Sequence, residues 1–344
     1  VDAVERRTGK KWLAGLYPFE GKKGPHGVWG DTAPVGTGTD DVRYNYLFME
    51  LAVELRRMPV GRELAQRLLD VYERPGDFFP NSEELVRGQF EMREGASRGF
   101  LGEESPRYPG VPAAALATRS VGLNYPTMAG LLVLPSVGLL FPGDPEAAYR
   151  AAYEAAFFDI GYAREATALL AAAQSAALAG KAPDVVVYET LAMDPLHLRG
   201  YFGGPFIGEK LPLLLKQAAG KKGEELANFL SSALRHFGVF DPYRALAIAC
   251  AALLAHADDP WQALLVAANH GDLDEAGTWR RCADVDCYAG ITGALIGACC
   301  GDRVLPEELI VRVVEGNRVV YSFDLEDTIE RFAQLILFLT GSED

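Results

Sequence analysis

The chain has 344 residues, of which 49% are hydrophobic and 23% are charged, a balance typical of a folded globular protein rather than a disordered one. Its formal net charge of −14 argues against a nucleic-acid binder, because most of the surface would repel phosphates. The five cysteines are an odd number with no Cys-x-x-Cys pair, which indicates neither a disulfide framework nor a zinc ribbon and favours a reducing, cytoplasmic setting.

Apolar residues recur at spacings of three and four along most of the chain, the period of an amphipathic helix. In chain order we expect helices near residues 40–58, 60–72, 124–141, 145–180, 207–218, 223–236, 242–256, 260–269, 286–300, 306–315 and 324–340. The segment 145–180 is too long for one ordinary helix, and Gly161 divides it in two. Runs rich in β-branched residues, typical of strands, occur only at 184–191 and 317–323. The pattern therefore predicts an all-α protein.

No linker, repeat or shift in composition divides the chain, so we expect a single domain over residues 1–344. The longest apolar run, 128–141, is too short to cross a bilayer and is interrupted by Pro135. The first residues do not have the form of a signal peptide, so we expect no membrane partner and a cytoplasmic location.

Thr39, Asp40 and Asp41 stand where a glycine-rich segment meets the helix expected from residue 40. One interpretation is helix capping, because hydroxyl and carboxylate oxygens accept hydrogen bonds from first-turn amides and negative charge is favourable there. The other interpretation is that these oxygens bind a hard cation. This stretch by itself leaves both open.

Asp284 and Asp286 stand at the start of a second helix, whose small residues allow close approach of its neighbours and indicate that it is buried. Capping is again one interpretation. Four buried carboxylates are costly, however, unless each is paired, protonated or coordinated. Arg43, Arg280 and Arg281 are candidate partners, and two divalent cations would balance the four charges. Oxygen ligands suit Mg²⁺, Mn²⁺ or Ca²⁺.

Three segments in this order resemble motifs of the ADP-ribosylglycohydrolase family. They are GTDD at 38–41, NYPTMAGLLVLPSVGLLFPGDPEAAYRAA at 124–152 and DVDCYAGITGALIGACCG at 284–301. The family forms are Thr-Asp-Asp-Thr early, Asn-Gly-Ala-Ala-Met-Arg in the middle and Gly-Gly-Asp-Thr-Asp-Thr late. The family's first helix, with its Gly-Asp-Ala-Leu-Gly signature, is not visible, so we expect it to be missing or diverged.

The resemblance implies an all-α fold with two Mg²⁺ ions, or Mn²⁺, in a central cleft. It implies that the metal ligands are Thr39, Asp40, Asp41, Asp284 and Asp286, and it places Asn124 in the binding motif of the middle segment. Asp286 would also position the attacking water. The implied activity is hydrolysis of an N- or O-glycosidic bond to ADP-ribose or ribose, on an ADP-ribosylated protein or on a smaller ribosylated metabolite.

The sequence departs from the family pattern at several positions. The late threonine is Cys287, a poor ligand for magnesium, and the early one is Val42. In the middle motif Tyr125 replaces a glycine and Ala129 replaces the arginine. The family's Thr-His-Gly-His-Pro stretch is DIGYARE at 159–165, without histidine. The lost histidines and arginine favour a smaller or altered substrate. Cys287 and the altered middle motif favour the alternative, a catalytically silent relative that binds only a ligand or a partner, and the retained carboxylates argue against it.

Two further assignments concern the late motif and the general acid. Asp272 and Asp274 also fit a Gly-Asp-x-Asp pattern, but we favour Asp284 and Asp286 because the small-residue helix follows them directly; the other pair would lie on an inserted loop at the cleft rim. Glu20 is the upstream carboxylate that we would test first as general acid. His270 is the histidine candidate, with an ordinary hydrogen-bonded role as the alternative.

Overall fold

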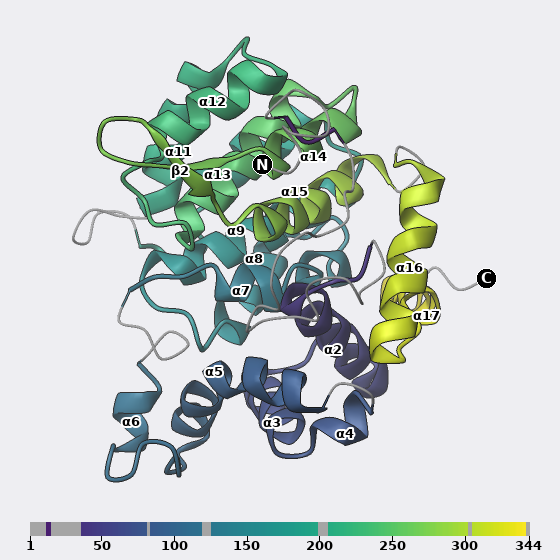
Figure 1. Cartoon of the computed structure of the whole chain (residues 1–344). Helices are drawn as coiled ribbons and strands as arrows, with labels where there is room; N and C mark the ends of the chain where they lie inside the picture. Colours follow the sequence, from purple (N-terminus) through teal and green to yellow (C-terminus); the bar gives the residue numbers. More distant parts are fainter. Residues whose placement is uncertain are drawn as a thin grey trace.

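The computed structural model describes residues 12–14, 36–80, 83–118, 125–198, 206–301 and 305–341. Two residues assigned from the sequence, Glu20 and Asn124, lie outside the described residues. The described chain is helical throughout except for one two-stranded hairpin (Figure 1). The all-α prediction is therefore confirmed.

The first half contains α2 (Asp40–Leu55), α3 (Gly61–Glu73), α4 (Pro75–Phe78), α5 (Glu83–Leu101), α6 (Ala113–Leu116), α7 (Ala129–Val133), the 3₁₀ turn η1 (Val137–Leu140), α8 (Pro145–Ala155) and α9 (Tyr162–Leu178). The second half contains α10 (Pro183–Ala192), α11 (Phe206–Ala218), α12 (Gly223–Ala233), α13 (Pro242–Ala255), α14 (Pro260–Ala268), β1 (Gly271–Leu273), β2 (Trp279–Cys282), α15 (Val285–Cys300), α16 (Glu307–Tyr321) and α17 (Leu325–Thr340). None of the described helices is long and apolar enough to cross a membrane.

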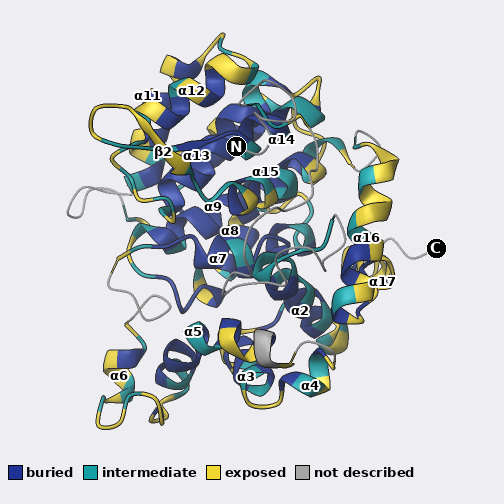
Figure 2. Ribbon diagram, viewed as in Figure 1, coloured by how far each residue is buried: buried dark blue, intermediate teal, exposed yellow. Residues whose placement is uncertain are grey.

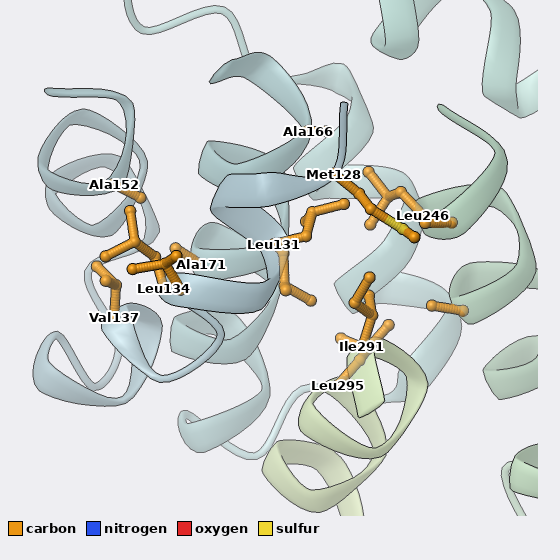
Figure 3. Packing of buried hydrophobic residues seen from close by; sticks show 14 of the residues in the cluster. Met128, Leu131, Leu134, Val137, Ala152, Ala166, Ala171, Leu246, Ile291 and Leu295 are labelled. Atoms are coloured by element: carbon orange, nitrogen blue, oxygen red, sulfur yellow. The ribbon is translucent and has the colours of Figure 1, made fainter. Parts of the chain in front are cut away.

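Helix α9 lies in the middle of the molecule and contacts α7, α8, α10, α13 and α15. Its sequence is rich in alanine, and almost every residue from Ala163 to Ala177 is buried (Figure 2). Short side chains allow helices to approach from several sides. Leu131 beside α9 and Ile291 and Leu295 of α15 meet in the same apolar core (Figure 3). Helix α9 therefore positions α15 directly and α2 through α7, which contacts both α2 and α9.

The predicted division of 145–180 at Gly161 is confirmed. The carboxylate of Asp144 caps α8 by accepting a hydrogen bond from the Ala147 amide at 3.0 Å, and Pro145 occupies the first helical position. Gly161 precedes α9 with a φ of 57°, a conformation that favours glycine. The chain can therefore reverse between two antiparallel helices.

Both predicted strands are wrong, because both segments are helical. Residues 184–191 belong to α10, where Pro183 sits at the first position and Val186, Val187, Thr190 and Leu191 form one buried face. Residues 317–321 form the last turns of α16, which continues beyond the predicted end at 315. In both cases packing against other helices outweighs the preference of β-branched residues for strands.

Three other features differ from the prediction. Pro135 divides the expected helix 124–141 into α7 and η1, because proline lacks the amide that a continuous helix needs. Helix α5 was not predicted, since its three glycines lower helix propensity. Gly99 of α5 lets the backbone of α6 approach closely, and an added Cβ would collide with it. The β1–β2 hairpin lies where an inserted loop was expected.

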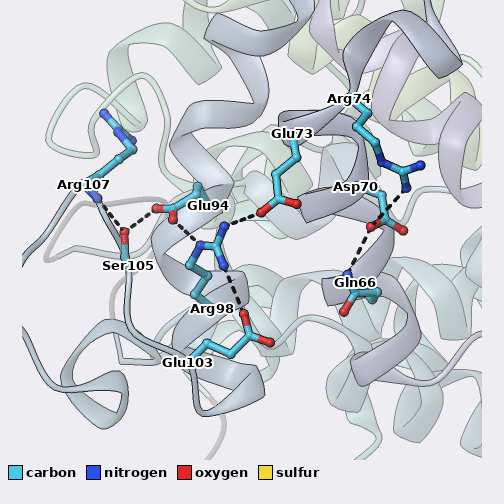
Figure 4. A network of polar contacts seen from close by, with 9 residues as sticks. All are labelled: Gln66, Asp70, Glu73, Arg74, Glu94, Arg98, Glu103, Ser105 and Arg107. Atoms are coloured by element: carbon cyan, nitrogen blue, oxygen red, sulfur yellow. Dashed lines mark hydrogen bonds and ion pairs between the residues drawn. The ribbon is translucent and has the colours of Figure 1, made fainter.

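Helices α3 and α5 are joined by a polar network centred on Arg98 (Figure 4). Arg98 pairs with the buried Glu94 at 2.5 Å, with Glu103 at 3.1 Å and with Glu73 of α3. Ser105 donates a further hydrogen bond to Glu94 at 2.6 Å. Both oxygens of the buried Glu94 carboxylate are therefore partnered, one by Arg98 and one by Ser105.

Candidate metal centre

The loop that carries Thr39 is held against α16. The Gly38 amide donates to the side-chain oxygen of Asn317 at 3.1 Å, and the Tyr321 hydroxyl donates to the Gly38 carbonyl at 2.8 Å. Thr39 is the N-cap residue of α2, and Asp40 and Asp41 form its first turn. The carboxylates at the start of α2 are thus positioned by a helix far away in the sequence.

Helix α15 begins directly after the hairpin. The Ala283 amide donates to the His270 carbonyl at 3.0 Å, which fixes the chain just before the N-cap residue Asp284. One turn further on, the buried Tyr288 donates from its hydroxyl to the Val239 carbonyl at 2.5 Å. These contacts anchor the first turn of α15, which carries Asp286 and Cys287.

The two helix starts meet. One carboxylate oxygen of Asp41, one of Asp286 and the Sγ atom of Cys287 lie within 4.8 Å of one another. Asp40 and Asp284 are close enough that their charges raise the pKa of Asp41. Segments separated by more than 240 residues therefore bring four carboxylates and one thiol together.

Capping does not account for Thr39 or Asp284. Neither side chain makes a cap hydrogen bond to its helix, although both residues occupy the N-cap position. By contrast, Asp144 and Asp241 cap α8 and α13 with their carboxylates. Asp286 does accept hydrogen bonds from the first amides of α15. The side-chain oxygens of Thr39 and Asp284 are thus not used for capping.

None of the described basic residues pairs with the cluster. Within the described part of the chain, the four carboxylates form no ion pair with an arginine or a lysine. Arg43 is buried against the Tyr321 ring, 4.3 Å from its centroid, and donates to Gln89. Arg281 pairs with Asp272 of the hairpin at 3.1 Å. The candidate partners named from the sequence are therefore engaged elsewhere or make no pair with the cluster.

Asp41, Asp284 and Asp286 have raised pKa values, which favour the protonated side chains as long as no cation is bound. Burial, followed by the charges of Asp40 and Asp286, raises the pKa of Asp41 well above its usual range. Burial and the charge of Asp286 raise the pKa of Asp284 to about 7. Burial also raises the pKa of Asp286, although this residue keeps contact with the surface. A divalent cation would reverse this balance, because it favours the ionised form of every neighbouring carboxylate.

The donor set fits a hard divalent cation in all but one respect. Carboxylate and hydroxyl oxygens are the ligands that Mg²⁺, Mn²⁺ and Ca²⁺ prefer. Thr39, Asp40, Asp41, Asp284 and Asp286 supply such oxygens at the two helix starts. The thiol of Cys287 is a soft donor that does not suit Mg²⁺. Burial and the charges of Asp41 and Asp284 raise the pKa of this thiol.

The alternative acidic pair lies apart from the cluster. Asp272 is paired with Arg281, and the Asp274 carboxylate accepts from the Thr278 amide at 2.8 Å in the hairpin turn. His270 is fully buried, its Nδ1 lies 3.1 Å from the Ser231 hydroxyl, and burial lowers its pKa to about 3. His270 therefore has the ordinary hydrogen-bonded role that was the alternative.

The anchoring residues Asn317 and Tyr321 were not found from the sequence. They lie four positions apart on α16 and both face the loop at Gly38. That spacing places two side chains on one face of a helix, and it was the available signal. The β-branched residues between them indicated a strand, in which the same two positions would also share a face.

Fold and cluster together define a class: all-helical proteins with a carboxylate-rich candidate cation site at two facing helix starts. The sequence matches the ADP-ribosylglycohydrolase family over residues 3–341, and the chain belongs to that family. No curated protein matches the sequence.

Proposed function

We propose that the protein is a magnesium-dependent hydrolase of an N- or O-glycosidic bond to ADP-ribose or ribose, with Mn²⁺ as a substitute. The observation that supports this most directly is the meeting of Asp41 and Asp286 from two helix starts, without a basic partner among the residues that the structure describes. Family membership supports the reaction class. The substrate is an ADP-ribosylated protein or a smaller ribosylated metabolite.

Each acidic side chain has a role in this proposal. Asp40, Asp41 and Asp284, with the hydroxyl of Thr39, hold the cations, which when bound orient vicinal hydroxyls and increase the acidity of water. Asp286 would be a further cation ligand and, because it reaches the surface, would also position the attacking water. The remaining carboxylate charge stabilises the positive charge that develops on the sugar ring as the glycosidic bond breaks.

The test is release of ADP-ribose from ADP-ribosylated protein and from ribosylated small molecules, in Mg²⁺ and in EDTA. Asp41→Asn should remove turnover, whereas Asp272→Asn, which changes a hairpin carboxylate paired with Arg281, should retain it. Turnover that persists in EDTA, or in Asp41→Asn, would contradict the proposal. Metal binding without turnover of any of these substrates would favour the silent relative.

A further inference from the structure

The group formed by Asp41, Asp286 and Cys287 combines two hard oxygen donors with one soft sulfur donor. Its ligand atoms lie within 4.8 Å of one another. Ligand atoms on one tetrahedral ion are roughly 3.5 Å apart, because the metal–ligand bonds are roughly 2.0–2.3 Å long. A small movement of these side chains would therefore bring all three onto a single ion.

The sulfur lies at the edge of the apolar core, beside the carboxylates. Cys287 is only 7% exposed, and its Sγ atom lies within 4.8 Å of one carboxylate oxygen of Asp41 and one of Asp286. Cys299 and Cys300 lie at the other end of the same helix and do not belong to the group. The anchored first turn of α15 thus presents one thiol to the acidic site.

We propose that Asp41, Asp286 and Cys287 form a position that binds a borderline divalent transition metal, such as Zn²⁺ or Co²⁺, in preference to Mg²⁺. Thiolate ligands select such metals, whereas Mg²⁺ prefers oxygen ligands in octahedral geometry. Asp40, Asp284 and Thr39 add only oxygen donors, so the rest of the site retains its preference for a hard cation. The position with Cys287 therefore holds a transition metal, and the all-oxygen position holds a hard cation.

This inference rests on the proposed function in one respect, namely that the carboxylates bind divalent cations. On binding, the Cys287 thiol releases its proton to the buffer and a metal–sulfur bond forms, with no change in oxidation state. Because Asp41 and Asp286 are shared with the rest of the cluster, the sulfur is the feature that sets the metal preference of this position.

The test is a titration of the metal-stripped full-length chain with Co²⁺, followed by the near-ultraviolet thiolate-to-cobalt charge-transfer band. We expect a saturable band that Zn²⁺ displaces and that an about hundredfold excess of Mg²⁺ leaves in place. Cys287→Ser and Cys287→Ala should both lack the band. Cys299→Ser, on the same helix but outside the group, should retain it.

The outcomes separate this inference from the proposed function. If Mg²⁺ binds but the wild-type chain gives no thiolate band with Co²⁺, the inference is wrong and the proposed function stands. If the band persists in both Cys287 variants, a different thiol is responsible and the inference is overturned. If no divalent cation binds at all, the inference and the proposed function are both wrong. Cys287→Thr should lower the affinity for Zn²⁺ relative to Mg²⁺ by about tenfold or more.

Discussion

Raising the pH of the metal-free protein should lower its free energy of unfolding. The pKa of Asp284 is about 7 in the folded chain and 3.8 for an ordinary aspartate. The folded chain therefore binds more protons than the unfolded chain between these two values, so stability falls as the pH rises through this window and levels off above it. At pH below 3.8 the carboxyl is protonated in both states and the effect disappears.

The size of the effect follows from the two pKa values. For Asp284 alone, linkage gives a loss of about 3 kcal/mol between pH 5 and pH 8. For a chain of 344 residues this corresponds to a decrease of about 4 °C in the melting temperature. The pKa of the buried Asp159 is also about 7, because burial raises it, and this residue adds a loss of the same sign.

Asp284→Asn tests the contribution of Asp284 itself, because Asp159 is unchanged in this variant. Chemical denaturation of the EDTA-treated proteins at several pH values is the assay. The variant should lose about 3 kcal/mol less than the wild type between pH 5 and pH 8. Equal pH dependence in the two proteins, or a wild type that becomes more stable as the pH rises, would refute the reasoning.

Three other perturbations have clear expected results. Arg98→Met leaves the buried Glu94 without its cation and should destabilise the protein by about 3–5 kcal/mol in urea denaturation. Arg74 is exposed, and Arg74→Met should lower the free energy of unfolding by less than about 1 kcal/mol. An equal loss of stability in the two variants would contradict the prediction. Gly130→Ala places a methyl group against the Asp159 carboxylate and should lower the free energy of unfolding by about 1–3 kcal/mol, measured by thermal unfolding. An unchanged melting temperature would show that Gly130 and the Asp159 carboxylate are not so close. Mg²⁺ at about a hundred times its dissociation constant should stabilise the wild type by about 2.7 kcal/mol, and Asp41→Asn should lose most of this gain; an equal gain in the variant would place the ion elsewhere.

Local signals in the sequence were sufficient for much of the fold. Asp144 and Pro145 mark the start of α8 and Gly161 its separation from α9, because capping and positive φ depend on single residues. The β-branched run of α10 was misread because its burial depends on distant helices, which a local pattern does not contain.

In the candidate site too, the features set by nearby residues were predicted and those set by distant helices were not. Its acidic residues were visible as two short motifs, and the structure brings Asp41 and Asp286 together. The sequence could not show that Thr39 and Asp284 do not cap their helices. The same residue types, with hydroxyl or carboxylate side chains, serve at a helix start both as caps and as metal ligands. The orientation of Cys287 toward the carboxylates likewise depends on how α2 and α15 pack.

The central claim is that the carboxylates at the starts of α2 and α15 bind ADP-ribose through divalent cations. The most direct test is calorimetric titration of ADP-ribose into the full-length protein with excess Mg²⁺, repeated in EDTA and with Asp286→Asn. We predict binding in Mg²⁺ that is lost in EDTA and in the variant. Binding that is unchanged in EDTA and in Asp286→Asn would contradict the claim.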